Sequence, residues 1–391
     1  MSVRVDATLL PTIEKYGNAD VEACFNCGNC TAICPLTSDR DSFPRRLIRY
    51  AQVGMKEQLL GSRELWLCYA CGECTATCPR EADPTGFMAA ARRYAIAQFD
   101  PLGLARRLFL SPVLTVLVLI LMSALMAAVV LIGNTPMPAG RLRLFEFIPP
   151  ERIHDLGVVV MAVMGVAGLI GVVNMVRGVR HVGGPSVRGA RLNWLGALWE
   201  TVGLDVLTQR RYRDDCTAHR KPEPWYLQQW LVHLSIMWGF LGLLGATALD
   251  YLTALAGIKP VGTPVPLWDP IRLLGTIAGV LLVYGTTVAF VKRIRGSEVS
   301  LQGSHPSDWA FLTLMWLAGA SGLILELFLY TPVEPAWGYS IMIFHVAVAM
   351  TLVLMAPFTK FAHAMYRTVA LYAHALKPVE ERELGGAASG D

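Results

Sequence analysis

The chain has 391 residues, of which 54% are hydrophobic and only 16% are charged. A soluble globular domain carries about 25% charged residues, so this composition excludes a disordered chain and an ordinary soluble enzyme. The net charge of +4 is too small to indicate nucleic-acid binding. We therefore expect an integral membrane protein with a polar domain and no nucleic-acid partner.

Residues 1–105 form the polar part, and eight of the nine cysteines lie there, between Cys24 and Cys78. This part has no apolar stretch of transmembrane length and no basic start followed by an apolar run, so we expect no secretory signal and a cytoplasmic location. Because the cytoplasm is reducing, metal ligation is favoured over disulfides. Cys216, far from the other cysteines, is expected to be an unligated thiol.

The eight clustered cysteines form two ladders of identical spacing, Cys24-x-x-Cys27-x-x-Cys30-x-x-x-Cys34-Pro and Cys68-x-x-Cys71-x-x-Cys74-x-x-x-Cys78-Pro. In such ladders three thiolates bind one [4Fe–4S] cluster and the fourth reaches the other cluster. Structural zinc is the alternative, but zinc sites usually take two pairs of ligands. We predict that cluster 1 is bound by Cys24, Cys27, Cys30 and Cys78, and cluster 2 by Cys68, Cys71, Cys74 and Cys34.

Fully ligated clusters have no open iron site, so the cysteine domain is expected to conduct electrons, and no residue is assigned a catalytic role.

Residues 106–375 form the membrane part, and residues 376–391 form a polar tail. Six apolar segments reach the ~20 residues needed to cross a bilayer, at roughly 111–133, 152–177, 229–251, 270–291, 309–330 and 339–361. A soluble helix bundle would need charged faces, and Ser111–Gly133 has no charged residue. The predicted fold is mainly α, with an N-terminal α-helical dicluster ferredoxin-like domain followed by a six-span transmembrane helix bundle.

Basic residues indicate the orientation in the membrane. They gather before the first span, in the 179–227 loop and after the fourth span, which the positive-inside rule places in the cytoplasm. We therefore expect a multi-pass protein of the cytoplasmic (inner) membrane, surrounded by lipid, with both termini cytoplasmic. The 179–227 loop would lie on the membrane surface, and docking of lipid headgroups or a partner is the alternative for it.

Four histidines lie within or beside the predicted spans. His345 and His363 are five helical turns apart, so one continuous helix would place them on one face, ~27 Å apart and near the two surfaces. A bis-histidine haem b needs two imidazoles at equal depth from different helices. We predict one haem between His233 and His363 near the cytoplasmic side and a second between His154 and His345 near the outer side.

Each of these histidines could instead bond a backbone carbonyl, and this alternative weighs most on His154. At least one haem b, and preferably two, is therefore expected. His305 is a reserve ligand on the cytoplasmic side. Near the outer side, Arg272, Glu326 and Asp155 are candidates for a quinone site, because a cation and carboxylates suit quinol binding and proton release. Interfacial anchoring is the alternative for each of them.

Two helix segments resemble a known family of membrane subunits. Trp230–Gly239, which contains His233, resembles the first haem helix of the respiratory nitrate reductase gamma-subunit family, and Phe344–His363 is similar to its last helix. The cysteine domain resembles the C subunit of heterodisulfide reductase. The fusion of the two resembles the QmoC family, the membrane subunits of the quinone-interacting membrane-bound oxidoreductase complex.

The resemblance implies electron transfer between the (mena)quinone pool and cytoplasmic partners through haem b and both clusters. Those partners would be flavin and iron–sulfur subunits related to the A subunit of heterodisulfide reductase, serving adenylylsulfate reductase in sulfate respiration. His233, His363 and His345 match haem ligands of the gamma-subunit family. Its fourth ligand falls near Leu243, so either His154 replaces it or the outer haem is absent. Arg272 stands where that family has a basic residue near its quinol site.

Other functions stay open at this point. The chain could be the membrane subunit of a heterodisulfide- or sulfite-pathway reductase complex, or a haem-free anchor that holds the cluster domain on the bilayer. An ion-translocating module would need carboxylates at mid-membrane, whereas the acids of this chain lie near the ends of the spans.

Overall fold

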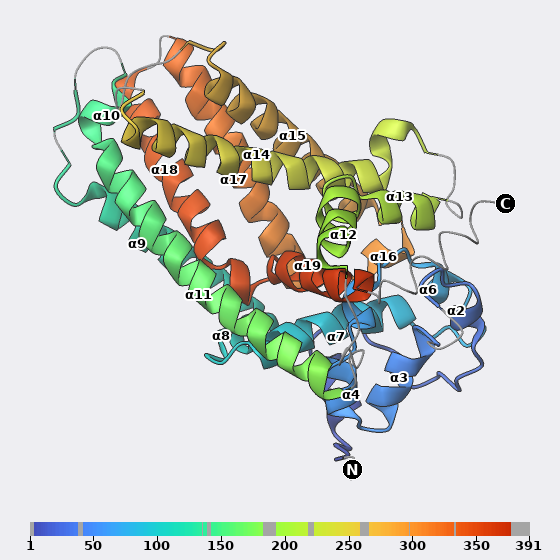
Figure 1. Ribbon diagram of the computed structural model, residues 1–391. Coiled ribbons are helices and arrows are strands. Elements are labelled where there is room, and N and C mark those ends of the chain that lie inside the picture. The colour runs from blue at the N-terminus through green and yellow to red at the C-terminus, as the bar shows by residue number, and fades with distance from the viewer. Residues whose placement is uncertain are drawn as a thin grey trace.

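The computed structural model describes residues 4–37, 42–134, 136–138, 142–182, 193–217, 223–258, 266–296, 298–331 and 334–376. Within these ranges every regular element is a helix (Figure 1). The predicted tail from residue 377 onward lies outside the described residues, as do residues 183–192 and 218–222 of the predicted cytoplasmic loop.

The cysteine domain is built from short helices around one apolar core. Leu47, Trp66 and Phe87 are among its fully buried side chains. The longest helix starts where Asp83 caps it by accepting a bond of 2.9 Å from the Gly86 amide. The helices are α1 (Leu9–Glu14), α2 (Asn29–Ala32), α3 (Arg45–Gln52), α4 (Lys56–Leu60), α5 (Glu64–Leu67), α6 (Glu73–Ala76) and α7 (Pro84–Phe99).

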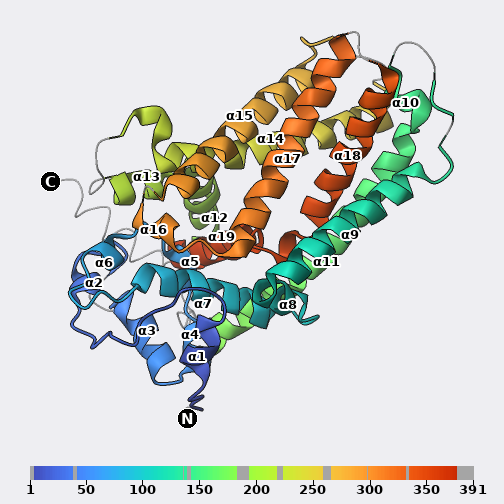
Figure 2. The ribbon, with the colours of Figure 1, turned by 180° about the vertical axis from the view of Figure 1, so that it is seen from behind.

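Six helices of the described chain are long and apolar enough to cross a membrane, which confirms the predicted fold class. They are α9 (Pro112–Leu131), α11 (Pro150–Val182), α14 (Gln229–Leu255), α15 (Pro270–Arg295), α17 (Pro306–Tyr330) and α18 (Pro335–Leu354). Figures 1 and 2 show α9 and α11 along one flank, α14 and α15 along the other, and α17 and α18 between them.

Helices α14 and α15 approach closely because glycines remove side chains from their interface. A Cβ on Gly239 would lie 2.6 Å from the backbone nitrogen of Leu282, and one on Gly285 would lie 2.9 Å from the carbonyl oxygen of Val232. Small residues at such crossings are typical of membrane helices, whose association depends on close packing rather than on the hydrophobic effect.

The sixth span ends earlier than predicted. Helix α18 stops at Leu354, a short 3₁₀ turn covers Ala356–Phe358, and α19 (Ala362–Ala375) runs in a new direction across the end of the bundle (Figure 1). Pro357 has no amide hydrogen to continue an α-helix, which accounts for the break. The prediction that His345 and His363 share one continuous helix, five turns apart, is therefore wrong.

The cysteine domain packs against one end of the bundle, here called the near end; the opposite end is the far end (Figures 1 and 2). Helix α11 has 33 residues and is therefore ~50 Å long, well beyond the ~30 Å of the hydrocarbon core. Its last turns reach the cysteine domain at Gly61, where a Cβ would lie 2.7 Å from the carbonyl oxygen of Gly178. Asn174 also donates to the carbonyl of Phe99 at 3.0 Å.

A buried ionic cluster joins the two parts at the near end. Asp308, in the first turn of α17, lies 2.8 Å from Lys360, 3.6 Å from Arg293 and 3.7 Å from Arg93 of the cysteine domain. Because one carboxylate contacts three cations from separate segments, it fixes their relative positions.

Shorter helices complete the connections. α8 (Leu104–Leu110) leads from the cysteine domain into α9, α10 (Leu144–Phe147) lies at the far end, and α16 (Val299–Gln302) precedes α17. The described part of the 179–227 loop forms α12 (Trp194–Leu198), a π-helical turn (Trp199–Val206) and α13 (Arg210–Thr217).

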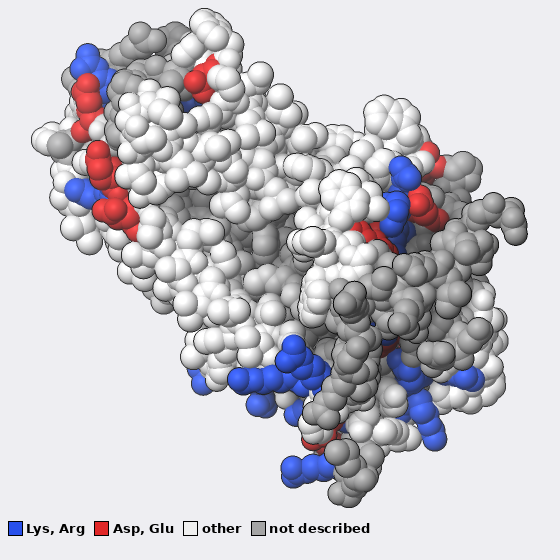
Figure 3. All heavy atoms as spheres, viewed as in Figure 1, with Lys and Arg blue, Asp and Glu red and all other residues white. Residues whose placement is uncertain are grey.

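The surface matches a chain that crosses a bilayer. Figure 3 shows a broad band without charged side chains, with Lys and Arg gathered below it around the near end and small mixed patches at the far end. Apolar side chains such as Val113, Leu117, Ile120 and Leu121 of α9 are more than half exposed. Large exposed apolar areas of this kind are explained by contact with lipid.

Candidate functional site

The two cysteine ladders form two copies of the same local structure. Gly28 and Gly72 have φ angles of 92° and 91°, and each is followed by a four-residue helix, α2 or α6, whose second residue is a ladder cysteine. Asn26 and Ala70, at the equivalent positions after the first cysteine of each ladder, also have positive φ. The amide of Ala70 donates to the sulfur of Cys68 at 3.3 Å, as expected where a loop turns its N–H groups toward a cluster.

The thiols fall into two neighbourhoods. Cys30 interacts electrostatically with Cys24, Cys27 and Cys78. Cys34 and Cys74 each interact most strongly with Cys68 and Cys71. The fourth cysteine of each ladder, Cys34 or Cys78, is thus coupled to cysteines of the other ladder; the binding of two clusters with exchanged fourth ligands stays a prediction.

Burial differs between the two neighbourhoods. It raises the pKa of Cys34 to about 12 and also raises the pKa of Cys74, and in the first neighbourhood it raises the pKa of Cys30. In the first neighbourhood Cys27 is exposed, and the nearby Phe25 is 62% exposed beneath the guanidinium of Arg80. The first set therefore reaches the surface at Cys27, whereas the four thiols of the second set are all partly buried.

His233 and His363 lie together at the near end. His233 interacts electrostatically with His363, although the two residues come from α14 and the start of α19. The side chain of His233 is exposed on α14. In Figure 3 the surface is hollowed beside α14, on the flank facing α11.

The bonding of His363 leaves one ring nitrogen available. Its Nδ1 lies 2.6 Å from the carbonyl oxygen of Lys360. Because a carbonyl only accepts, Nδ1 carries the proton and Nε2 is the free acceptor, the state in which a histidine binds a metal. His233 and His363 therefore have the residue type and the proximity that the two axial ligands of a haem need, and haem binding itself stays a prediction.

His345 shows the same arrangement on α18. Its Nδ1 lies 3.0 Å from the hydroxyl of Ser321, which itself donates to the carbonyl of Leu317 at 2.6 Å. The hydroxyl oxygen is thus the acceptor of the Nδ1 proton, and Nε2 of His345 is available. The imidazole lies against Gly322, where a Cβ would come within 2.9 Å of it.

His154 is directed to a different neighbour. Its ring packs edge-on against Tyr251 of α14, with ring centroids 4.7 Å apart, whereas His345 packs against α17. The helices α11 and α18 meet through apolar residues such as Val160 and Ala347. In this conformation the two imidazoles serve separate contacts, so a shared haem would require His154 to turn away from Tyr251.

His305, the reserve ligand, is the N-cap of α17. Its Nδ1 accepts a bond from the Ser307 amide at 3.2 Å, and Asp308 accepts one from the His305 amide at 3.2 Å. This capping box gives His305 a structural role.

Two of the three quinone-site candidates form an ion pair between α15 and α17 at the far end. Arg272 Nε donates to Glu326 Oε1 at 3.0 Å, and Thr276 donates to the same oxygen at 2.6 Å. The guanidinium lies over the Tyr330 ring, and among the described residues none accepts a hydrogen bond from its buried Nη2. Asp155, on α11, is exposed and lies outside this group.

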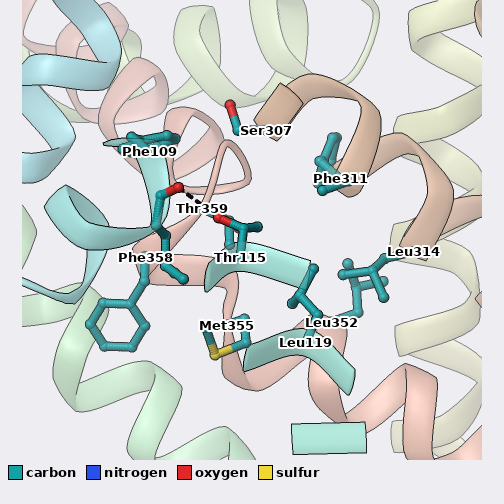
Figure 4. Close-up of a pocket in the computed structure, with 12 residues that line it drawn as sticks. Phe109, Thr115, Leu119, Ser307, Phe311, Leu314, Leu352, Met355, Phe358 and Thr359 are labelled. Atoms are coloured by element: carbon teal, nitrogen blue, oxygen red, sulfur yellow. Dashed lines mark hydrogen bonds between the residues drawn. The ribbon is translucent and has the colours of Figure 1, made fainter. Parts of the chain in front are cut away.

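A pocket between α8, α9, α17 and the end of α18 has few polar groups (Figure 4). Its walls are mainly apolar, including Phe109, Phe311 and Met355. Thr115 on its edge donates to the carbonyl of Leu108 at 2.6 Å and is thereby satisfied. We interpret it as a packing defect beside the ionic cluster.

Two family models match the chain. Residues 20–82 match the 4Fe-4S dicluster domain, and residues 101–385, well over half of the chain, match citrate utilization protein B. The chain belongs to the citrate utilization protein B family. The Escherichia coli citrate utilization protein B is 28% identical over 125 residues, covering 31% of each chain. No solved structure matches.

This member of the citrate utilization protein B family is also similar to components of heterodisulfide reductases. The E subunit of the dihydromethanophenazine:CoB–CoM heterodisulfide reductase of Methanosarcina barkeri is 26% identical over 187 residues, 46% of this chain and 67% of the relative. The C subunit of the H(2):CoB-CoM heterodisulfide,ferredoxin reductase of Methanothermobacter thermautotrophicus is 34% identical over 62 residues, 16% of this chain and 34% of the relative. The chain is therefore an iron–sulfur membrane electron-transfer subunit related to heterodisulfide reductase subunits. The finer assignment to QmoC stays a prediction.

Proposed function

We propose that the chain conducts electrons between the quinone pool and cytoplasmic flavin and iron–sulfur subunits. The observation that carries the proposal is the position of α19, which begins beside His363 and packs against the backbone of Cys68 through Arg367. The proposed haem ligands and the proposed cluster ligands would thus be close to one another at the near end. When bound, haem b and the two [4Fe–4S] clusters would supply one-electron chemistry there.

Separate sets of residues would hold the haem and the two clusters, from the membrane part to the surface of the cysteine domain. His363 and His233 would hold the inner haem, with Lys360 fixing the His363 tautomer through its carbonyl. Cys68, Cys71, Cys74 and Cys34, all partly buried, would hold cluster 2. Cys24, Cys27, Cys30 and Cys78 would hold cluster 1, whose exposed Cys27 faces the partner side.

At the far end, we propose a quinone site at the Arg272–Glu326 pair. The unpartnered Nη2 of Arg272 is a donor for a quinone oxygen. Glu326 would accept a proton released when menaquinol or another quinol is oxidised, and Thr276 would hold that carboxylate in place. Asp155, one helix away and exposed, would pass protons to the outside.

A second haem near this site would be held by His345 and His154, with the His154 ring turned from Tyr251. In the form that the QmoC resemblance implies, the partners are related to the A subunit of heterodisulfide reductase and the complex serves adenylylsulfate reductase. The cysteine domain, the near end and both termini would then be in the cytoplasm, and the far end would face outward.

The proposal is tested with the full chain purified in detergent from its host membrane. We expect non-haem iron and sulfide for two clusters and haem b by pyridine haemochrome assay, all reduced by menadiol. The C216S variant, with a cysteine outside the ladders changed, is the control and should keep its iron. A chain without haem would be an anchor only and would contradict the proposal.

A further inference from the structure

One arginine at the near end belongs to the same helix as His363 and contacts the cysteine domain. Arg367 lies one turn after His363 on α19, so the two side chains share a face of that helix. Its Nη1 donates to the carbonyls of Trp66 and Cys68, each at 3.0 Å. Arg367 also interacts electrostatically with His233.

A second arginine reaches the same carbonyl from the cysteine domain. Arg92 of α7 donates from Nε to Leu65 at 2.8 Å and from Nη2 to the carbonyl of Cys68. Two guanidinium groups therefore converge on the peptide of one ligand of the second cysteine set. In the first set, Arg45 reaches the carbonyl of Asn26 by a single longer bond of 3.4 Å.

Aromatic rings extend this contact to His233. The Arg367 guanidinium lies over the Tyr69 ring at 4.7 Å from its centroid. Tyr69 stacks on Tyr212 of α13, with centroids 5.5 Å apart and planes 14° apart. Tyr212 in turn meets the His233 ring edge-on at 6.0 Å. The path from Cys68 to His233 is thus an unbroken series of packed groups, one of which comes from the 179–227 loop.

We propose that Arg367, Tyr69 and Tyr212 form the junction through which electrons pass between cluster 2 and the haem of His233 and His363, and that Arg367 and Arg92 together raise the reduction potential of cluster 2 above that of cluster 1. This inference rests on the proposed function. Each transfer moves one electron without making or breaking a bond: the haem iron is oxidised as cluster 2 is reduced, or the reverse.

The two arginines would raise this reduction potential because cluster 2 gains one negative charge when it is reduced. Nearby cations and hydrogen bonds stabilise the more negative, reduced state, and so raise the potential. Cluster 2 would then be the membrane-facing cluster. Cluster 1, beside the exposed Cys27, would exchange electrons with the soluble partner.

The test is an EPR-monitored redox titration of the purified full chain. Arg367→Gln and Arg92→Gln should each lower the midpoint potential of cluster 2, with about a tenfold change in its reduction equilibrium, or about 59 mV for one electron. Arg367→Lys, which keeps the charge, should shift it less. The cluster 2 signal is identified by its loss in Cys74→Ser.

Arg63→Gln is the matched control, because Arg63 joins α5 to α19 through the Ala373 carbonyl at 3.3 Å. It should leave both midpoints unchanged. The inference is overturned if both clusters are present and neither Arg367→Gln nor Arg92→Gln moves cluster 2, or if cluster 1 moves instead. Should Arg367→Gln fail to assemble, Arg92→Gln decides. Absence of haem or clusters in the unmodified chain would contradict the proposed function itself.

The role of the aromatic rings in the junction is tested by the rate of electron exchange. Tyr212→Leu should slow electron exchange between haem and cluster 2 at least several-fold in stopped-flow measurements while both midpoints stay constant, and Tyr212→Phe should retain the rate. An unchanged rate in Tyr212→Leu would remove Tyr212 from the junction.

Discussion

Replacement of Asp308 by asparagine tests how the cysteine domain is held against the bundle. Asparagine keeps the size of the side chain and can still accept the bond from the His305 amide. It removes the single negative charge that contacts Lys360, Arg293 and Arg93. Because the side chains of Arg93 and Arg293 are only 7% and 13% exposed, little water is available to solvate these two cations.

The size of the effect follows from burial. Removing one partner of a buried ion pair costs about 3–5 kcal/mol, because the other charges stay buried and unpaired. That free energy corresponds to about a hundredfold to a few thousandfold increase in the opening equilibrium of the near end. Hydrogen exchange of the α7 amides, measured by mass spectrometry in detergent, reports this opening.

Two further variants test whether a change in hydrogen exchange comes from the ionic cluster. Glu146→Gln removes an exposed ion pair with Arg143. It should change the opening free energy measured by hydrogen exchange by less than about 1 kcal/mol. Arg93→Met added to Asp308→Asn should recover part of the loss, because it removes one uncompensated cation. Exchange in Asp308→Asn within threefold of the unmodified chain would refute the role given to this cluster.

Three further outcomes are expected. His363→Ala should remove the inner haem, seen as a lower haemochrome yield, and a full yield would exclude His363 as a ligand. Burial lowers the pKa of His305 to about 4, so the stability it gives α17 is complete above pH 6.5, its ordinary value, and is lost as the pH falls toward 4. The variant His305→Asn, which keeps a capping acceptor, should flatten that acid-side loss of thermal stability, and an unchanged pH profile would contradict this. Gly239→Leu should separate α14 from α15 and lower the melting temperature, whereas Gly245→Leu, where a Cβ would meet nothing within 4 Å, should not.

Local patterns predicted much of this molecule. The cysteine spacing indicates two equivalent loops, and the positive φ at Gly28 and Gly72 shows how each loop turns. The apolar segments indicate six spans because length and hydropathy are properties of each segment alone. The sequence predicted only that Arg272 and Glu326 lie near the same side of the membrane. The hydrogen bond between them depends on how α15 and α17 pack in the fold.

The remaining features depend on contacts between distant residues. Pro357 was visible in the sequence, but a proline can kink a membrane helix or end it, and packing at the near end decides. Arg367 and Cys68 are 299 positions apart, and no periodicity connects them. Asp308 stands just before the predicted fifth span, and its three cations come from three other segments.

If electrons pass between the haem and cluster 2 at the near end, reduction of the clusters by quinol must depend on His363. The purified chain would be reduced with menadiol while the optical haem spectrum and the cluster EPR signals are followed, in the unmodified protein and in His363→Ala. We expect haem reduction to precede cluster reduction, and we expect loss of His363 to stop the clusters from being reduced by quinol while dithionite still reduces them. Full reduction of the clusters by menadiol in His363→Ala would contradict this expectation.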